Sequence, residues 1–101
     1  MQECKNSTQQ QQDGIEVHYY PSGELQECRY WLDGKLHRDD DPAYEWYYKN
    51  GNVKLRVWYN HGARHRDYGP AVEYYDENGA IVERQWYKNG ELQREIERQS
   101  R

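Results

Sequence analysis

An internal repeat with a period of 28 residues constrains this chain more than any other feature. Residues 31–43 read WLDGKLHRDDDPA, and residues 59–71 read YNHGARHRDYGPA. The same register continues through columns of glycine and aromatic residues, which are Gly23/Gly51/Gly79, Gly34/Gly62/Gly90, Tyr19/Tyr47/Tyr75, Tyr30/Trp58/Trp86 and Trp31/Tyr59/Tyr87. A fixed period of this length is typical of repeat architectures, in which each supersecondary unit stacks on the next.

Each unit has the composition of a β-hairpin. Residues 49–51 and 88–90 both read Lys-Asn-Gly, and Asn and Gly tolerate the positive φ that tight turns need. The Tyr, Trp and Val residues between the turns are strand formers. Pro42 and Pro70 cannot donate to a sheet ladder, so each marks the beginning of a strand. We therefore predict an all-β fold, a single-layer twisted antiparallel sheet of about three consecutive β-hairpin repeats.

The ends of the chain differ from this pattern. We expect a flexible polar tail at residues 1–13, a repeat domain at 14–95 with units near 19–46, 47–74 and 75–95, and a charged tail at 96–101. The third unit lacks the Gly-Pro-Ala sequence. Because Leu92 and Ile96 lie four positions apart among charges, the segment is predicted to be a short closing helix or a charged strand that blunts a sheet edge.

Composition narrows the classes of function. Leu, Ile and Val are few and Phe is absent, but 11 Tyr and 4 Trp supply apolar surface that keeps a polar edge. The net charge of −4 argues against DNA or an anionic membrane as the main partner. No apolar run approaches a membrane span and no signal-peptide core is visible, so we expect a cytoplasmic location. Cys4 and Cys28 are expected to be free thiols.

The units resemble MORN repeats (membrane occupation and recognition nexus) in a divergent form. The resemblance is carried by the Tyr-Tyr-x-x-Asn-Gly and Trp-Tyr-x-x-Gly motifs over residues 14–95. The His-Arg-x-x-Gly-Pro-Ala insert is similar to a variant in small proteins of giant viruses, bacteriophages and some bacteria. The resemblance implies a β-hairpin array that serves as an interaction scaffold, in some cases for lipids. This chain departs from the pattern, because Asp41 stands where Gly69 does and Gln93 replaces the histidine.

The repeated charged residues have a chemical and a structural interpretation. His37 and His65 would lie about 10 Å apart on neighbouring hairpins, too far to share a zinc ion with bonds of about 2 Å. Asp39, Asp40 and Asp41 lack a neighbouring glycine-rich phosphate loop for a Mg²⁺ site. No serine stands in a nucleophile constellation, so we expect no catalysis, no metal and no cofactor. The structural interpretation assigns the connecting loop to His37, Arg38, Pro42, Ala43, His65, Arg66, Gly69, Pro70 and Ala71.

The remaining interpretation is a non-enzymatic protein–protein interaction module. Tyr, Trp and Arg dominate binding hot spots. The candidate binding residues are Tyr30, Trp31, Trp46, Tyr48, Trp58, Tyr59, Tyr74, Trp86 and Tyr87. Two versions stay open: a small viral or phage accessory or inhibitor protein that binds one protein target, and a scaffold that forms homo-oligomers through its sheet edges. A lipid headgroup is a further alternative, and nucleic acid is disfavoured because stacking on aromatics also needs a positive groove.

Overall fold

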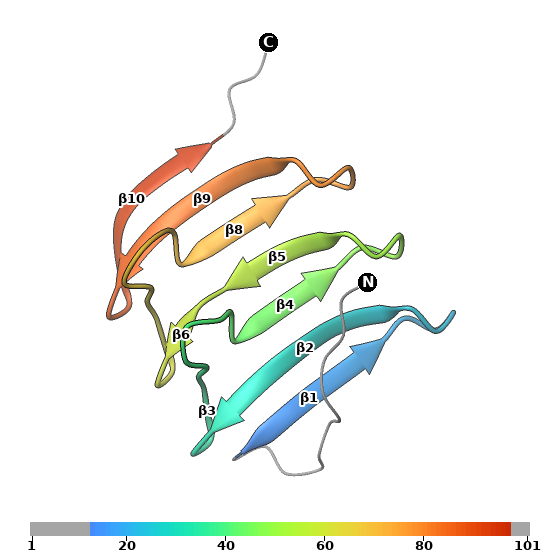
Figure 1. The fold of residues 1–101 in the computed structure, drawn as a ribbon, viewed down its shortest axis with the longest axis horizontal. Coiled ribbons are helices and arrows are strands. Elements are labelled where there is room, and N and C mark those ends of the chain that lie inside the picture. Colours follow the sequence, from blue (N-terminus) through green and yellow to red (C-terminus); the bar gives the residue numbers. More distant parts are fainter. Residues whose placement is uncertain (1–12, 98–101) are drawn as a thin grey trace.

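The computed structural model describes residues 13–97, and every regular element among them is a β-strand. The strands are β1 (Gly14–Tyr19), β2 (Leu25–Leu32), β3 (Lys35–Leu36), β4 (Tyr44–Tyr47), β5 (Val53–Val57), β6 (Tyr59–Asn60), β7 (Ala63–Arg64), β8 (Val72–Tyr75), β9 (Ile81–Lys88) and β10 (Glu91–Glu97). The main sheet has the order β1-β2-β4-β5-β8-β9-β10, with β3 beside β2 (Figure 1). β6 and β7 pair separately. The predicted all-β sheet of consecutive hairpins is confirmed.

The molecule is one layer thick. Its extents are 44 × 33 × 16 Å, whereas two sheets packed face to face need about 10 Å between their backbones alone. Figure 1 shows the strands side by side in one twisted array, with turns at both ends of the strands. Both faces of this sheet therefore carry side chains that neighbouring hairpins must cover.

The turns explain the spaced glycines. At the junction of β6 and β7, His61 and Gly62 have φ values of 50° and 89°. The junction of β2 and β3 repeats this with Asp33 at 53° and Gly34 at 76°. Two consecutive positive φ values define the tight hairpin turn whose twist matches that of its strands.

A β-bulge recurs once in each unit, always directly before the Tyr19/Tyr47/Tyr75 column. In the middle unit Trp46 pairs with Leu55, while Tyr47 pairs with Val53. Because adjacent residues of a strand point to opposite faces, the bulge places Val53 and Leu55 on opposite faces of the sheet.

The His-Arg segment forms a loop between two residues, His37 and Ala43, that both hydrogen-bond to Tyr30 of β2. The chain leaves β2 after His37, whose N–H donates to the Tyr30 carbonyl at 3.0 Å, and returns at Ala43, whose carbonyl accepts from the Tyr30 N–H at 2.8 Å. The third unit has no such excursion, and β10 follows β9 from Glu91 to Glu97 with a single bulge between Leu92 and Arg94. The expected closing helix is therefore wrong, and its alternative, a charged edge strand, is what forms.

The buried residues are few and mostly small or aromatic. Among the described residues they are Cys28, Ala43, Tyr47, Val57, Trp58, Ala71, Val72 and Glu45. The expectation of a free thiol is wrong for Cys28, which is disulfide-bonded, and Cys4 lies outside the described residues. Within residues 13–97 no helix has the length and apolarity that a membrane-spanning helix requires.

Candidate functional site: the insert loops and the cavity between them

Two loops at residues 37–42 and 65–70, here called the insert loops, are held by the same internal bonds. His37 Nε2 lies 2.9 Å from Asp39 Oδ1, and the Nη1 group of Arg38 donates to the Pro42 carbonyl at 3.3 Å. The second loop repeats both contacts, at 2.8 Å for His65 with Asp67 and 3.0 Å for Arg66 with Pro70. The histidine contacts join two side chains, whereas the arginine bonds satisfy the proline carbonyls, so each loop is stabilised by its own side chains.

Each unit places a guanidinium group over one aromatic ring of the strand. The Arg38 guanidinium lies 3.9 Å from the ring centroid of Tyr30, and that of Arg66 lies 3.8 Å from the ring of Trp58. These distances are well within the range of a cation–π contact. The aromatic column of the sheet is thus partly covered from the loop side.

The third unit reaches the same contact from a different backbone position. Arg94 pairs with Trp86, in the place that Ala71 occupies opposite Trp58. Its guanidinium lies 4.1 Å from the Trp86 ring. Although this unit has no insert loop, it keeps the cation over the ring.

The histidines connect each insert loop to the next unit. Nδ1 of His37 accepts the N–H of His61 at 3.0 Å, and Nδ1 of His65 accepts the N–H of Asn89 at 2.9 Å. An imidazole that accepts at Nδ1 and donates from Nε2 to a carboxylate is neutral, with its hydrogen on Nε2. Both nitrogens of each ring are thereby occupied, and the described residues contain no cluster of three or more metal-ligating side chains.

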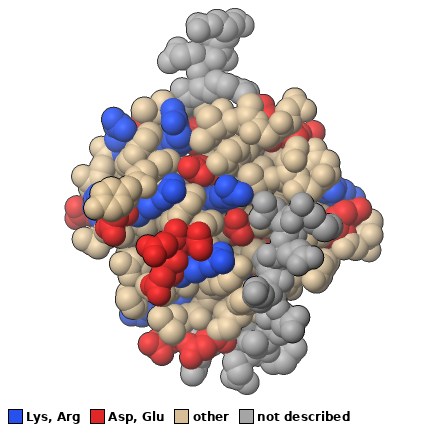
Figure 2. Space-filling model, in the orientation of Figure 1, with Lys and Arg blue, Asp and Glu red and all other residues tan. Residues whose placement is uncertain are grey.

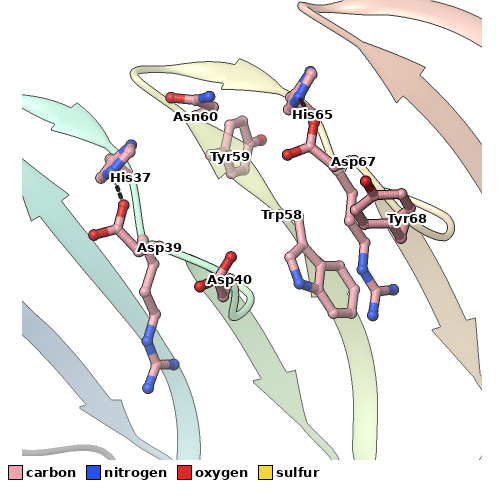
Figure 3. Close-up of a pocket in the computed structure, with 11 residues that line it drawn as sticks. His37, Asp39, Asp40, Trp58, Tyr59, Asn60, His65, Asp67 and Tyr68 are labelled. Atoms are coloured by element: carbon pink, nitrogen blue, oxygen red, sulfur yellow. Dashed lines mark hydrogen bonds and ion pairs between the residues drawn. The ribbon is translucent and has the colours of Figure 1, made fainter.

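A cavity of about 540 Å³ lies between the two insert loops. Its walls are the loop residues 37–40 and 65–68 and the strand segment 58–60. Figure 3 shows Trp58 and Tyr59 rising between the two loops, with Asp40 on one side and Tyr68 on the other. Residues distant in the sequence are brought together here because equivalent loops of successive repeats are neighbours in space.

The nine aromatic residues selected from the sequence do not gather in one patch. Trp58 and Tyr59 line the cavity, and Tyr30 and Trp86 lie under guanidinium groups. The hydroxyl of Tyr48 donates to the Tyr75 carbonyl at 2.8 Å, a bond between units.

The other four occupy further positions along the sheet. Trp31 donates from Nε1 to Glu16 at 3.0 Å, and the Lys54 ammonium lies 4.0 Å from the Trp46 ring. Tyr87 accepts a hydrogen bond from Arg64 at 3.0 Å, while Tyr74 is 36% exposed. The candidate set is therefore distributed over both faces, because adjacent positions such as Tyr30 and Trp31 point in opposite directions.

Tyr68, which is not among the nine candidate residues, is the most exposed large hydrophobic side chain within residues 13–97, at 91%. It stands at the apex of the second insert loop, in the column where the first loop carries Asp40. The signal that identifies it is an aromatic residue at one of the two positions where the insert loops differ, the other being Asp41 against Gly69.

The resolved pKa shifts move groups away from neutral pH. Burial, followed by a hydrogen bond to Glu73, raises the pKa of Tyr75 to about 12. Burial also opposes ionisation of Glu16, but hydrogen bonds from His18 and Trp31 outweigh it and leave the Glu16 pKa lowered. A general acid or base works best with a pKa near the working pH, and these shifts do not create one.

Charge on the face shown in Figure 2 is mixed. Lys and Arg alternate with Asp and Glu over this face, without a broad field of one sign. Recognition of nucleic acid or of an anionic membrane by electrostatic attraction relies on a concentrated basic patch.

The fold defines a class of protein, an open array of consecutive β-hairpins. The chain belongs to the MORN repeat family, since the model of the MORN repeat variant matches residues 12–33, 43–61 and 81–99, more than half of its length. Repeats of this family are typically non-enzymatic modules for interaction with proteins or membranes. No curated protein and no solved structure matches the chain. Both insert loops lie outside the matched segments.

Proposed function

We propose that this protein is a non-catalytic module that binds a protein partner through its insert loops, with Tyr68 as the central anchor. The observation that carries the proposal is the 91% exposure of Tyr68 on a loop that is held by hydrogen bonds from its own side chains and from Lys88. The ammonium of Lys88 donates to the carbonyls of Arg66 and Asp67 at 3.1 and 2.9 Å, in addition to the bonds within the loop. An aromatic side chain on a fixed backbone gains contact area on binding with little loss of conformational entropy.

The proposal has two forms, which differ in the partner. In the first, the protein is a small accessory or inhibitor protein, as its resemblance to viral and phage proteins suggests, and it holds one target. In the second, it self-assembles through the edges of the sheet. The charged residues Glu91, Arg94 and Glu95 on edge strand β10 favour the first form, because charged side chains on an edge oppose pairing with another chain.

Affinity capture with three versions of the protein tests the proposal. Wild type and the control Tyr19→Ala should recover the same protein partner, since Tyr19 is also exposed, at 62%, but lies on β1. Tyr68→Ala should lose that partner while keeping the melting temperature of the wild type. Equal recovery by Tyr68→Ala and wild type would contradict the role of the loop. Sedimentation of the purified protein separates the two forms, because only the scaffold form associates alone.

A further inference from the structure

We propose that the cavity between the insert loops receives a basic side chain, Lys or Arg, from the partner protein. This inference rests on the proposed function, because it names the chemistry of the partner segment beside Tyr68. The cavity contains cationic side chains that have partners within the protein and acidic side chains without a Lys or Arg partner.

The two arginines of the cavity are occupied. Besides its cation–π contact, each donates to a proline carbonyl of its own loop. Arg38 also lies 3.9 Å from Asp41, and Arg66 lies 3.6 Å from Glu73. Neither of these carboxylates lines the cavity, so the arginine charges are directed away from an occupant.

Among the described residues, no Lys or Arg forms an ion pair with the three carboxylates that line the cavity. Asp39 and Asp67 each receive one hydrogen bond from an imidazole that the Nδ1 contacts hold neutral, and their side chains are 89% and 75% exposed. Asp40 is also exposed and lies on the same loop as Asp39, whereas Asp67 lies on the opposite loop. Three acidic groups therefore face a cavity whose cations already have partners, which favours a cationic occupant.

A hydrogen-bond donor without a partner at the cavity wall indicates that the occupant also supplies a hydrogen-bond acceptor. Trp58 lines the cavity, is only 7% exposed, and its Nε1–H has no hydrogen-bond partner. Figure 3 shows its indole between the two loops, with the nitrogen on the side of Asp40. Buried donors are nearly always paired in native proteins. A peptide segment carries both a cation for the carboxylates and carbonyl oxygens for this donor, whereas a metal ion offers no acceptor.

Titration of the isotopically labelled full chain tests the inference by nuclear magnetic resonance. The probes are the N-acetyl methylamides of lysine, arginine and glutamate. The two basic probes should shift the indole N–H signal of Trp58 saturably, and the glutamate probe should not. Asp40→Asn should weaken binding of the basic probes by about 1.5- to 5-fold, the range for one exposed charge pair.

Asp33→Asn is the matched control. Asp33 and Asp40 are both exposed and have φ values of 53° and 66°, which asparagine tolerates, but Asp33 does not line the cavity. The control should bind the probes as the wild type does.

Three results of the titration would overturn the inference: no saturable shift with either basic probe, an equal shift with the glutamate probe, or equal weakening by both substitutions. These results leave the proposed function intact if partner capture still depends on Tyr68. Conversely, if the basic probes bind but capture of the partner does not depend on Tyr68, the proposed function is refuted and the binding site for a basic group is supported. Binding to vesicles of phosphatidylserine and phosphatidylcholine that requires Arg38 and Arg66 would also refute the inference, because an anion would then be the occupant.

Discussion

Replacing His65 with alanine should destabilise the protein by about 2 kcal/mol, because this ring joins the second insert loop to the third unit. The bond from the Asn89 N–H to Nδ1, at 2.9 Å, is worth about 1 kcal/mol on average. The His65 side chain is 15% exposed, so its loss also removes packing worth about 1 kcal/mol. The bond to Asp67 adds little, since that carboxylate is 75% exposed and finds water instead.

Urea denaturation followed by tryptophan fluorescence measures this change in the free energy of unfolding. A loss of about 2 kcal/mol corresponds to a fall in melting temperature of about 8–16 °C for a domain of this size. His18→Ala is the control, because the His18 side chain is 45% exposed and lies on β1, away from any insert loop. Its effect should stay within about 0.5 kcal/mol, as for most surface substitutions.

Amide hydrogen exchange distinguishes the connection between units from general loss of packing. In His65→Ala the Asn89 amide should exchange faster relative to the amides of β1 and β2, which are bonded in a distant hairpin. Unchanged stability, or an Asn89 amide as protected as in the wild type, would refute the reasoning that the imidazole holds the next turn.

Three further predictions concern the sheet. Gly62→Val should unfold the protein or lower its melting temperature strongly by circular dichroism, because Gly62 has a φ of 89°, which a β-branched residue adopts only with strain; an unchanged melt would contradict the turn assignment. Ala71→Leu should cost about 1–3 kcal/mol by urea titration, since Ala71 is fully buried, whereas Ala80→Leu, at an exposed position, should be nearly neutral. Because burial and then Glu73 raise the pKa of Tyr75 to about 12 from 10.0, its neutral form stabilises the fold fully below pH 10. That contribution should be lost as the pH rises from 10 toward 12. Tyr75→Phe should show a shallower alkaline loss of stability, and an identical alkaline profile would exclude this tyrosine as a cause.

The hairpins were predictable because their signals are local. The turn at His61 and Gly62 needs positive φ at both positions, and the glycine marks it in the sequence. The secondary structure around Leu92 and Ile96 was not predictable from local signals, because a spacing of four fits a helix as well as a strand. The segment forms a strand because its pairing with β9 satisfies backbone N–H and C=O groups at the edge of β9, which a helix would leave without partners.

The candidate site was less predictable because its contacts join distant residues. The position of Arg66 over Trp58 depends on the path of the insert loop and on the strand pairing of Ala71, neither of which has a periodic signature. The bulge at Tyr47 likewise moves Val53 to the face opposite Leu55, which simple alternation does not anticipate. Tyr68 has no periodic signature, because its counterpart in the first insert loop is Asp40.

The bonds between units suggest how such a chain changes length. Tyr20 donates to the Tyr47 carbonyl and Tyr48 to the Tyr75 carbonyl, and in each case the partner belongs to the adjacent unit. A tandem duplication of residues 47–74 would therefore keep this tyrosine-to-carbonyl bond at each new junction between units. Stability in such arrays grows by one unit and one interface at a time. The duplicated chain would also acquire a second cavity of the same kind, so that one genetic event could convert a single contact site into a bivalent one.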